Sequence, residues 1–334
     1  MRFARKVFCV AVFLAVCACC GPVGRVSAAE PEKTQAKYAR SMKYVSGSPD
    51  AATAWGKKLR AKLFVLMKID DLVSRKNPAP LAPKIVSTQK RDKYVLQIVE
   101  VSSTKNRRMK FAITLPTGRK GPLPAVVAIG GHSSTQLSCL DSARGYHRFA
   151  HVLSENGYVT ISRRVSQHKP FRRARTLMGE RLWDLMRCVD YLESLKQVDA
   201  KRIGCGGLSL GGEMAMWLGG MDTRIKATLS AGFLTVMDQM EKNHCMCWKF
   251  PGLRDLVDFA DIYALTAPRA LMCQNGLAEP PTQFCVPLAR KAMKEIAPAY
   301  ADFKKPANLE LVVHKGGHEI DLPSLVAFFE KRLK

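Results

Sequence analysis

The sequence predicts an α/β fold: a mostly parallel, doubly wound sheet of about eight strands with helices on both faces and an N-terminal helical extension. Strand-like runs alternate with helix-like segments over most of the 334 residues, which is typical of parallel sheets. The run over residues 124–129 is apolar throughout, as in strands buried on both faces. A short strand ending at residue 205 leads into a glycine-flanked serine and then a helix.

Residues 1–28 are predicted to form a secretory signal peptide, so we expect a secreted or periplasmic protein. A basic start precedes an apolar run over residues 7–20, and small residues lead to the expected cleavage after Ala28. The apolar run is too short and wrongly flanked for a stable membrane span. The membrane is expected as a partner only if the chain is lipid-anchored, a less favoured alternative that would use Cys17, Cys19 or Cys20.

Residues 29–83 are expected to form a helical extension and a proline-rich connector. Apolar residues recur there at steps of three and four, which predicts one buried helix face: Trp55, Leu59, Leu63, Leu66 and Met67. Prolines within residues 78–83 end the pattern. Residues 84–334 are expected to form the main domain, with a lid-like insertion over residues 232–267.

The elements of the main domain follow from apolar alternation, apolar runs and helical stripes. The first expected strands are 94–101 and 111–115, which pair as a hairpin, and 124–129. A helix over 146–155, a strand over 158–162 and a helix over 179–196 are expected next, followed by the strand that ends at 205 and a helix over 213–218. The last expected elements are strands over 225–230, from 268 and over 309–313, and a helix over 322–334.

Residues 207–211 read Gly-Leu-Ser-Leu-Gly, the G-x-S-x-G pattern of a nucleophile elbow centred on Ser209. A serine on a sharp strand-to-helix turn has strained backbone geometry, so side chains two residues to either side would collide. The helix that follows directs its N-terminal amides at the reacting oxygen. The alternative is a glycine-rich turn without chemistry.

Two downstream residues are candidates to complete a triad, in the order nucleophile, acid, histidine. Glu279 ends the loop after a buried strand, where a triad carboxylate would lie; a surface glutamate is the alternative. His318 follows the last strand and Gly316-Gly317, a position from which it can turn toward Ser209. The competing histidine, His314, continues the apolar alternation of that strand, which favours a structural role.

Backbone amides are the expected oxyanion hole: Leu210 after the serine, with Gly131 or His132 after the strand over 124–129. A tight turn alone is the alternative for Gly130-Gly131. Weaker candidates for substrate contact are Arg163 and Arg164, at the carboxyl end of a strand, and Trp248 of the insertion. A solvated basic loop is the alternative for the two arginines.

The net charge of +25 would fall to +21 without the four basic residues of the predicted signal peptide. Such a charge suits an anionic polymer or an acidic polysaccharide. The basic residues are scattered and form no known nucleic-acid motif, so no nucleic acid is expected and a generally basic surface is favoured.

Seven cysteines follow the predicted signal peptide, and an odd number leaves at least one thiol. Cys188, Cys205 and Cys273 lie on apolar faces and are interpreted as small buried hydrophobes. Cys245-Met246-Cys247 beside His244 is not C-x-x-C, and no second ligand pair is obvious, so neither a metal nor another cofactor is expected. Disulfide pairing and oligomeric state stay open.

These motifs together resemble the α/β-hydrolase superfamily, and more narrowly secreted bacterial proteins grouped with dienelactone hydrolases and acetyl xylan esterases. The resemblance covers residue 125 to the C-terminus and is carried by the elbow and by residues 179–187, 198–204, 261–269 and 316–318. The chain departs from the pattern in three places. Relatives usually have a His-Gly pair where this chain has Gly130-Gly131-His132, and they often have Asp at the position of Glu279. Glucuronoyl esterases have Arg where this chain has Leu210.

The resemblance implies a serine esterase whose catalytic domain spans residues 84–334 and whose substrate is a small-molecule or polysaccharide ester such as acetylated xylan. Ser209 would be the nucleophile, His318 the base and Glu279 the acid. A lactone hydrolase or a serine peptidase is the alternative within the superfamily. A binding protein for an anionic polymer, without catalysis, is the alternative from another class.

Overall fold

The computed structural model describes residues 38–334 except 46, 75–78 and 243, and these residues form one unit. The predicted signal peptide lies outside the described residues. Among the residues described, no helix has the length and apolar character needed to cross a bilayer.

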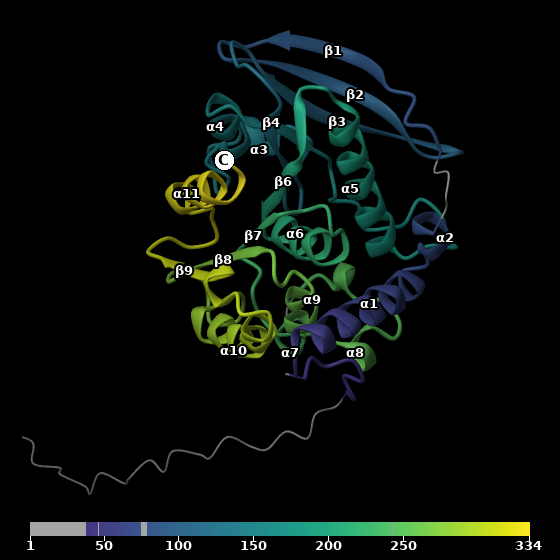
Figure 1. The fold of residues 1–334 in the computed structure, drawn as a ribbon, viewed down its shortest axis with the longest axis vertical. Helices are drawn as coiled ribbons and strands as arrows, with labels where there is room; N and C mark the ends of the chain where they lie inside the picture. Colours follow the sequence, from purple (N-terminus) through teal and green to yellow (C-terminus); the bar gives the residue numbers. More distant parts are fainter. Residues whose placement is uncertain (1–37, 46, 75–78, 243) are drawn as a thin grey trace, which may run out of the picture. The chain divides into compact units, whose positions relative to one another are not determined.

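One nine-stranded sheet organises the described chain, in the order β1-β2-β3-β5-β4-β6-β7-β8-β9 (Figure 1). From β5 to β9 all neighbours are parallel, whereas β1, β2 and β3 add antiparallel pairs at one side. The predicted parallel, doubly wound core is therefore confirmed. The strands are β1 (Lys84–Lys90), β2 (Tyr94–Thr104), β3 (Arg107–Pro116), β4 (Leu123–Ile129), β5 (Val159–Ser162), β6 (Val198–Leu208), β7 (Ala227–Ala231), β8 (Ala270–Gly276) and β9 (Leu309–His314).

Side chains of the central strands alternate between two apolar cores, because successive residues of a strand face opposite sides. Val126 and Ala128 of β4 join the core under α3 (Ser138–Asp141), α4 (Phe149–Glu155) and α11 (Leu322–Leu333). Val127 and Ile129 join the larger core on the other face. That core packs under α1 (Pro49–Leu66), α5 (Leu177–Ser194), α6 (Leu210–Met221), α9 (Phe259–Ala264) and α10 (Val286–Asp302).

The N-terminal helix α1 begins at Pro49, and the side chain of the preceding Ser48 accepts a hydrogen bond from the amide of Ala51. Leu59 and Leu63 are fully buried, as the predicted stripe requires. Arg60 of the same helix donates to the carbonyls of Gly220 (2.7 Å) and Leu265 (2.5 Å). Helix α1 and the short α2 (Asp70–Val73) thus pack on the main domain.

Several elements of the fold were not expected, among them α3, β1 and α10. Strand β1 is exposed along its whole length, so no apolar alternation marks it in the sequence. Helix α10 contains Pro298, which interrupts the helical pattern. The insertion contains short helical segments: α7 (Met237–Met240), the 3₁₀ turn η1 (Met246–Trp248), α8 (Leu253–Leu256) and α9.

Helix α6 approaches β7 so closely that Gly219 has no room for a side chain. A Cβ there would lie 2.2 Å from Oγ1 of Thr228, a fully buried residue of β7. We expect Gly219→Ala to lower the free energy of unfolding by about 1–3 kcal/mol despite the better helix propensity of alanine. Urea denaturation measures this loss. Gly47→Ala is the control, because its nearest neighbour would be 3.4 Å away, and an equal loss in both variants would contradict the packing argument.

Candidate active site

The turn between β6 and α6 holds Ser209 in a strained backbone conformation, with φ 63° and ψ −125°. Positive φ is uncommon for a residue with a Cβ and concentrates at functional sites. Two hydrogen bonds secure the turn: Ser209 N–H donates to the carbonyl of Ala231, and Glu213 N–H donates to the carbonyl of Ser209, both at 2.9 Å. The half-buried serine thus lies where the parallel strands end.

The glycines two residues before and after the serine are required by the neighbouring strand. A Cβ at Gly207 would lie 2.3 Å from the carbonyl oxygen of Ile129, and a Cβ at Gly211 would lie 2.0 Å from the same atom. Ile129 is paired with Gly207 in the β4–β6 ladder, so it cannot move away without breaking the sheet. The expected collision at both positions is confirmed.

His318 and Glu279 lie together although 39 residues separate them. His318 Nδ1 is 2.7 Å from Oε1 of Glu279, whose side chain is fully buried. Backbone hydrogen bonds join the two loops: Leu277 N–H donates to the carbonyl of His314 (2.8 Å), and Ala278 N–H donates to that of Gly316 (3.0 Å). Two strand-end loops therefore hold the imidazole against a carboxylate.

The His318 ring is positioned from both sides. Phe284 stacks on it with ring centroids 5.4 Å apart and an angle of 20° between the planes. On another side, a Cβ at Gly232 would lie 2.9 Å from the Cε1 atom of His318, and Gly232 has a φ of +57°. Only glycine tolerates both conditions.

Ser209 and His318 line one pocket of about 110 Å³. Residues of the insertion and of the loop after β8 form the rest of its wall. The complete lining is His132, Ser209, Leu210, Glu213, Phe233, Met240, His244, Cys245, Cys247, Gln283, Phe284 and His318. Residues of the insertion thus form part of the pocket wall. His244 and Glu213 are polar lining residues that sequence reasoning did not assign to an active site.

The expected oxyanion donors are only partly available. The amide of Gly131 donates to the hydroxyl oxygen of Tyr146 at 2.8 Å, so this amide already has an acceptor and its oxyanion role stays a prediction. The fold brings Tyr146 to the loop that contains Gly131, a contact that no local sequence pattern predicts. The amides of His132 and Leu210 have no acceptor among the described residues, and Leu210 begins α6, where amides lack helical partners.

The three weaker candidates for substrate contact do not line the pocket. Arg163 instead pairs with the buried carboxylate of Asp184 at 3.0 Å. Arg164 donates to the hydroxyl of Ser166 at 2.8 Å. Trp248 is 1% exposed and packs edge-on against Phe259, with ring centroids 5.4 Å apart. In this structure burial and polar contacts with other residues occupy these side chains, and their role in substrate contact stays a prediction.

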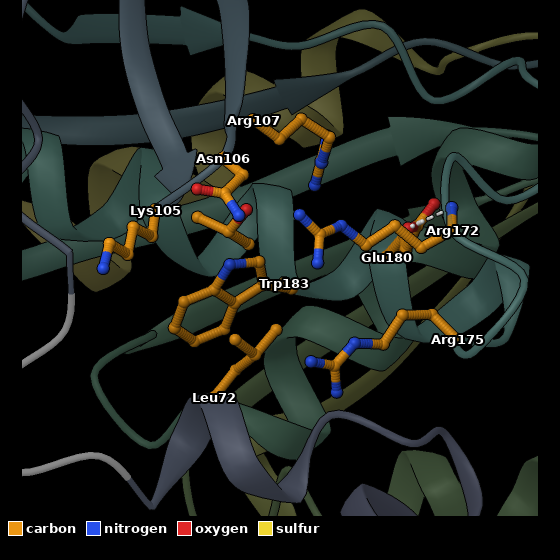
Figure 2. Close-up of a pocket in the computed structure, with 9 residues that line it drawn as sticks. Leu72, Lys105, Asn106, Arg107, Arg172, Arg175, Glu180 and Trp183 are labelled. Carbon is orange, nitrogen blue, oxygen red and sulfur yellow. Dashed lines mark hydrogen bonds between the residues drawn. The ribbon is translucent and has the colours of Figure 1, made fainter.

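A second pocket, of about 170 Å³, lies between α2, the β2–β3 turn and the start of α5 (Figure 2). Cationic side chains surround it: Lys105, Arg107, Arg172 and Arg175. Glu180 is its single acidic lining residue and accepts the backbone amides of Phe171 (2.5 Å) and Arg172 (3.0 Å). Neither serine nor histidine lines this pocket, so the candidate active site is the one beside Ser209.

Comparisons with known proteins find similar sequences over part of the chain. A family model described as "Glucuronyl esterase, fungi" matches residues 98–232. YtaP of Bacillus subtilis, a protein named as a hydrolase, is 24% identical over 242 residues, which are 65% of this chain and 79% of YtaP.

Solved structures extend the likeness to most of the chain. A protein of Bacteroides fragilis described as an acetyl xylan esterase has a TM-score of 0.69 at 19% identity, covering 85% of this chain and 81% of the other. A glucuronoyl esterase from Solibacter usitatus has a TM-score of 0.65 at 18% identity, covering 84% and 93%. The strand order, the elbow and these likenesses together establish that the chain has the α/β-hydrolase fold.

Proposed function

We propose that this protein is a serine hydrolase of carboxylic esters, with carbohydrate esters as its substrates. The observation that carries the proposal is the contact of His318 with the buried Glu279, 2.7 Å apart, in which the histidine shares a pocket with the strained Ser209. A nucleophile, a base and a group that orients the base are the parts that acyl transfer through a covalent intermediate needs.

In the proposed mechanism, Oγ of Ser209 bonds to the ester carbonyl carbon while Nε2 of His318 takes its proton. Nδ1–H of His318 donates to Glu279, which holds the tautomer and stabilises the imidazolium. The imidazolium then protonates the departing alkoxide. A water molecule repeats the sequence on the acyl-enzyme, releasing the acid and restoring Ser209.

The amides of Leu210 and His132 are the proposed donors to the tetrahedral oxyanion. Leu210 N–H lies at the positive end of the α6 macrodipole, where negative charge is stabilised. Each donor of this kind contributes about 10²–10³ in rate. The glutamate at position 279 offers the same charge and hydrogen-bonding group as the aspartate of related enzymes.

The pocket supports a small acyl group such as acetyl. Its volume is about 110 Å³, and apolar Leu210 stands beside the nucleophile. A predicted secreted protein with the fold of an acetyl xylan esterase fits an acetylated polysaccharide. The glucuronyl esterase family model over residues 98–232 favours a second candidate, a glucuronic acid ester. Leu210 stands where glucuronoyl esterases have arginine, so we place this candidate second.

Glu213 is the polar residue of the pocket best suited to meet a sugar hydroxyl. It lies four residues after Ser209, and its Oε1 is buried without a hydrogen-bond partner among the described residues. Burial raises the pKa of this carboxyl from 4.5 to about 7, with nearby Arg181 acting in the opposite direction. A carboxyl that titrates near neutrality can accept or donate a hydrogen bond.

Replacing the nucleophile tests the reaction class. We expect Ser209→Ala to lower kcat/KM for a short-chain chromogenic acetate ester by about 10³-fold or more, and Glu279→Gln by about 10²-fold or more. Ser87→Ala, on the exposed strand β1, is the matched control and should leave the rate unchanged. Labelling of the parent but not Ser209→Ala by a fluorophosphonate probe checks the nucleophile. An unlabelled, inactive parent with native circular dichroism would favour a binding protein instead.

Acyl selectivity tests the substrate. Because the pocket is small, we expect kcat/KM to fall at least about tenfold from acetyl to octanoyl esters, since a tight pocket discriminates through overpacking. Release of acetate from acetylated xylan oligosaccharides, compared with hydrolysis of methyl glucuronate, ranks the two candidates. Faster hydrolysis of methyl glucuronate would reverse their order.

The raised pKa of Glu213 predicts a pH-dependent cost to stability. The carboxyl ionises near pH 4.5 in the unfolded chain but near 7 in the folded protein, so the parent loses stability as pH rises through that window. Relative to Glu213→Gln, the loss should be on the order of 3 kcal/mol, at about 1.4 kcal/mol per pKa unit. Urea titrations at pH 5 and 8 measure it. The control Glu330→Gln, at an exposed residue, should lose as much stability between pH 5 and 8 as the parent. If Glu213→Gln loses as much stability as the parent over the same range, the raised pKa of Glu213 is contradicted.

A further inference from the structure

Four potential metal ligands converge beside the proposed active site, from three separate parts of the chain. His132 follows β4, His168 follows β5, and Cys245 and Cys247 belong to the insertion. One ligand atom of each lies within 4.8 Å of the others. We infer that these residues form a four-coordinate site for Zn²⁺, with two thiolates and two imidazoles.

The distances suit zinc. Bond lengths of about 2.3 Å to sulfur and about 2.0 Å to nitrogen place the ligand atoms of a tetrahedron about 3.5 Å apart. His132 Nε2 and Cys247 Sγ are 3.3 Å apart. His132 and His168 lie face to face, with ring centroids 5.4 Å apart and planes inclined by 28°. Rotation of exposed side chains brings the other ligand atoms to this spacing, since both histidines and Cys245 lie at the surface.

The surroundings hold this arrangement in place. Trp248 is buried directly after Cys247 and anchors the end of η1, whereas Met246 between the two cysteines is 45% exposed. The pair of sulfurs therefore lies on a turn whose position is fixed by a core residue.

Arg181 of α5 connects both halves of the cluster. Its Nη1 is 3.6 Å from Sγ of Cys247, and its Nη2 donates to the carbonyl of Gln167, the residue before His168. Arg181 is fully buried. Arg181 thus contacts one proposed ligand and the residue before another, and partners of this kind orient metal ligands.

The donor set indicates zinc and a structural role. Two thiolates and two neutral imidazoles balance the charge of a divalent cation, so the site is neutral despite its basic surroundings. Tetrahedral sulfur and nitrogen ligation is typical of zinc. Four protein ligands leave no open position for a water nucleophile. The ion would tie the insertion to two loops at the end of the sheet, and His132, Cys245 and Cys247 also line the Ser209 pocket.

Cobalt titration of the metal-free protein, kept reduced, tests the site. We expect thiolate-to-cobalt charge-transfer absorption that saturates at about one cobalt per chain and disappears when Zn²⁺ is added. Protein purified in the presence of zinc should contain about one zinc per chain by mass spectrometry and show a higher Tm than the metal-free form.

Variants locate the binding. Cys245→Ser and His168→Ala should each weaken zinc binding by more than about 10²-fold while native circular dichroism is retained, because both residues lie at the surface. Cys285→Ser and His151→Ala are the matched controls outside the cluster and should bind zinc like the parent. Unchanged cobalt absorption in the first two variants, or its absence in the parent, would overturn the proposal. So would a Cys245–Cys247 disulfide in protein purified with zinc. None of these readouts requires esterase activity.

Discussion

The whole site depends on one steric contact, that of the carbonyl of Ile129 with the turn between β6 and α6. Cβ atoms at Gly207 and Gly211 would lie 2.3 and 2.0 Å from this oxygen. Without them, α6 can begin immediately at the end of β6, and the hydrogen bonds of the β4–β6 ladder stay intact. Within this closely packed turn Ser209 has a φ of 63°, a strained conformation for a residue with a Cβ.

Because neighbouring strands are parallel, their carboxyl ends meet at one edge, and loops distant in sequence gather there. Two constellations result. Glu279 and His318 come from the loops after β8 and β9, and the four sulfur and nitrogen donors come from the loops after β4, β5 and β7. His132 belongs to the second constellation and also lines the Ser209 pocket. A change in the insertion would therefore affect both.

The basic composition has a structural use in this fold. Arg107 and Arg163 both pair with the buried carboxylate of Asp184, at 2.5 and 3.0 Å. Arg187, which is almost fully buried, donates to the carbonyl of Ala79 at 2.6 Å and so holds the proline-rich connector. Guanidinium groups suit such positions because one planar group can satisfy several acceptors. Part of the high charge thus joins the hairpin and the connector to α5 rather than facing a polymer.

The sequence by itself determined the parallel core and the glycine-flanked turn around Ser209, and it predicted the order of serine, acid and histidine in the proposed triad, because apolar runs and glycine spacing are local properties of the chain. Only the tertiary structure decided which side chains are free. It assigned the Gly131 amide to Tyr146, Arg163 to Asp184 and Trp248 to the core. It also brought His132 and His168 to Cys245 and Cys247, across up to 115 residues. Contacts of this kind arise when loops meet at a sheet edge, and the spacing of residues along the sequence does not predict them.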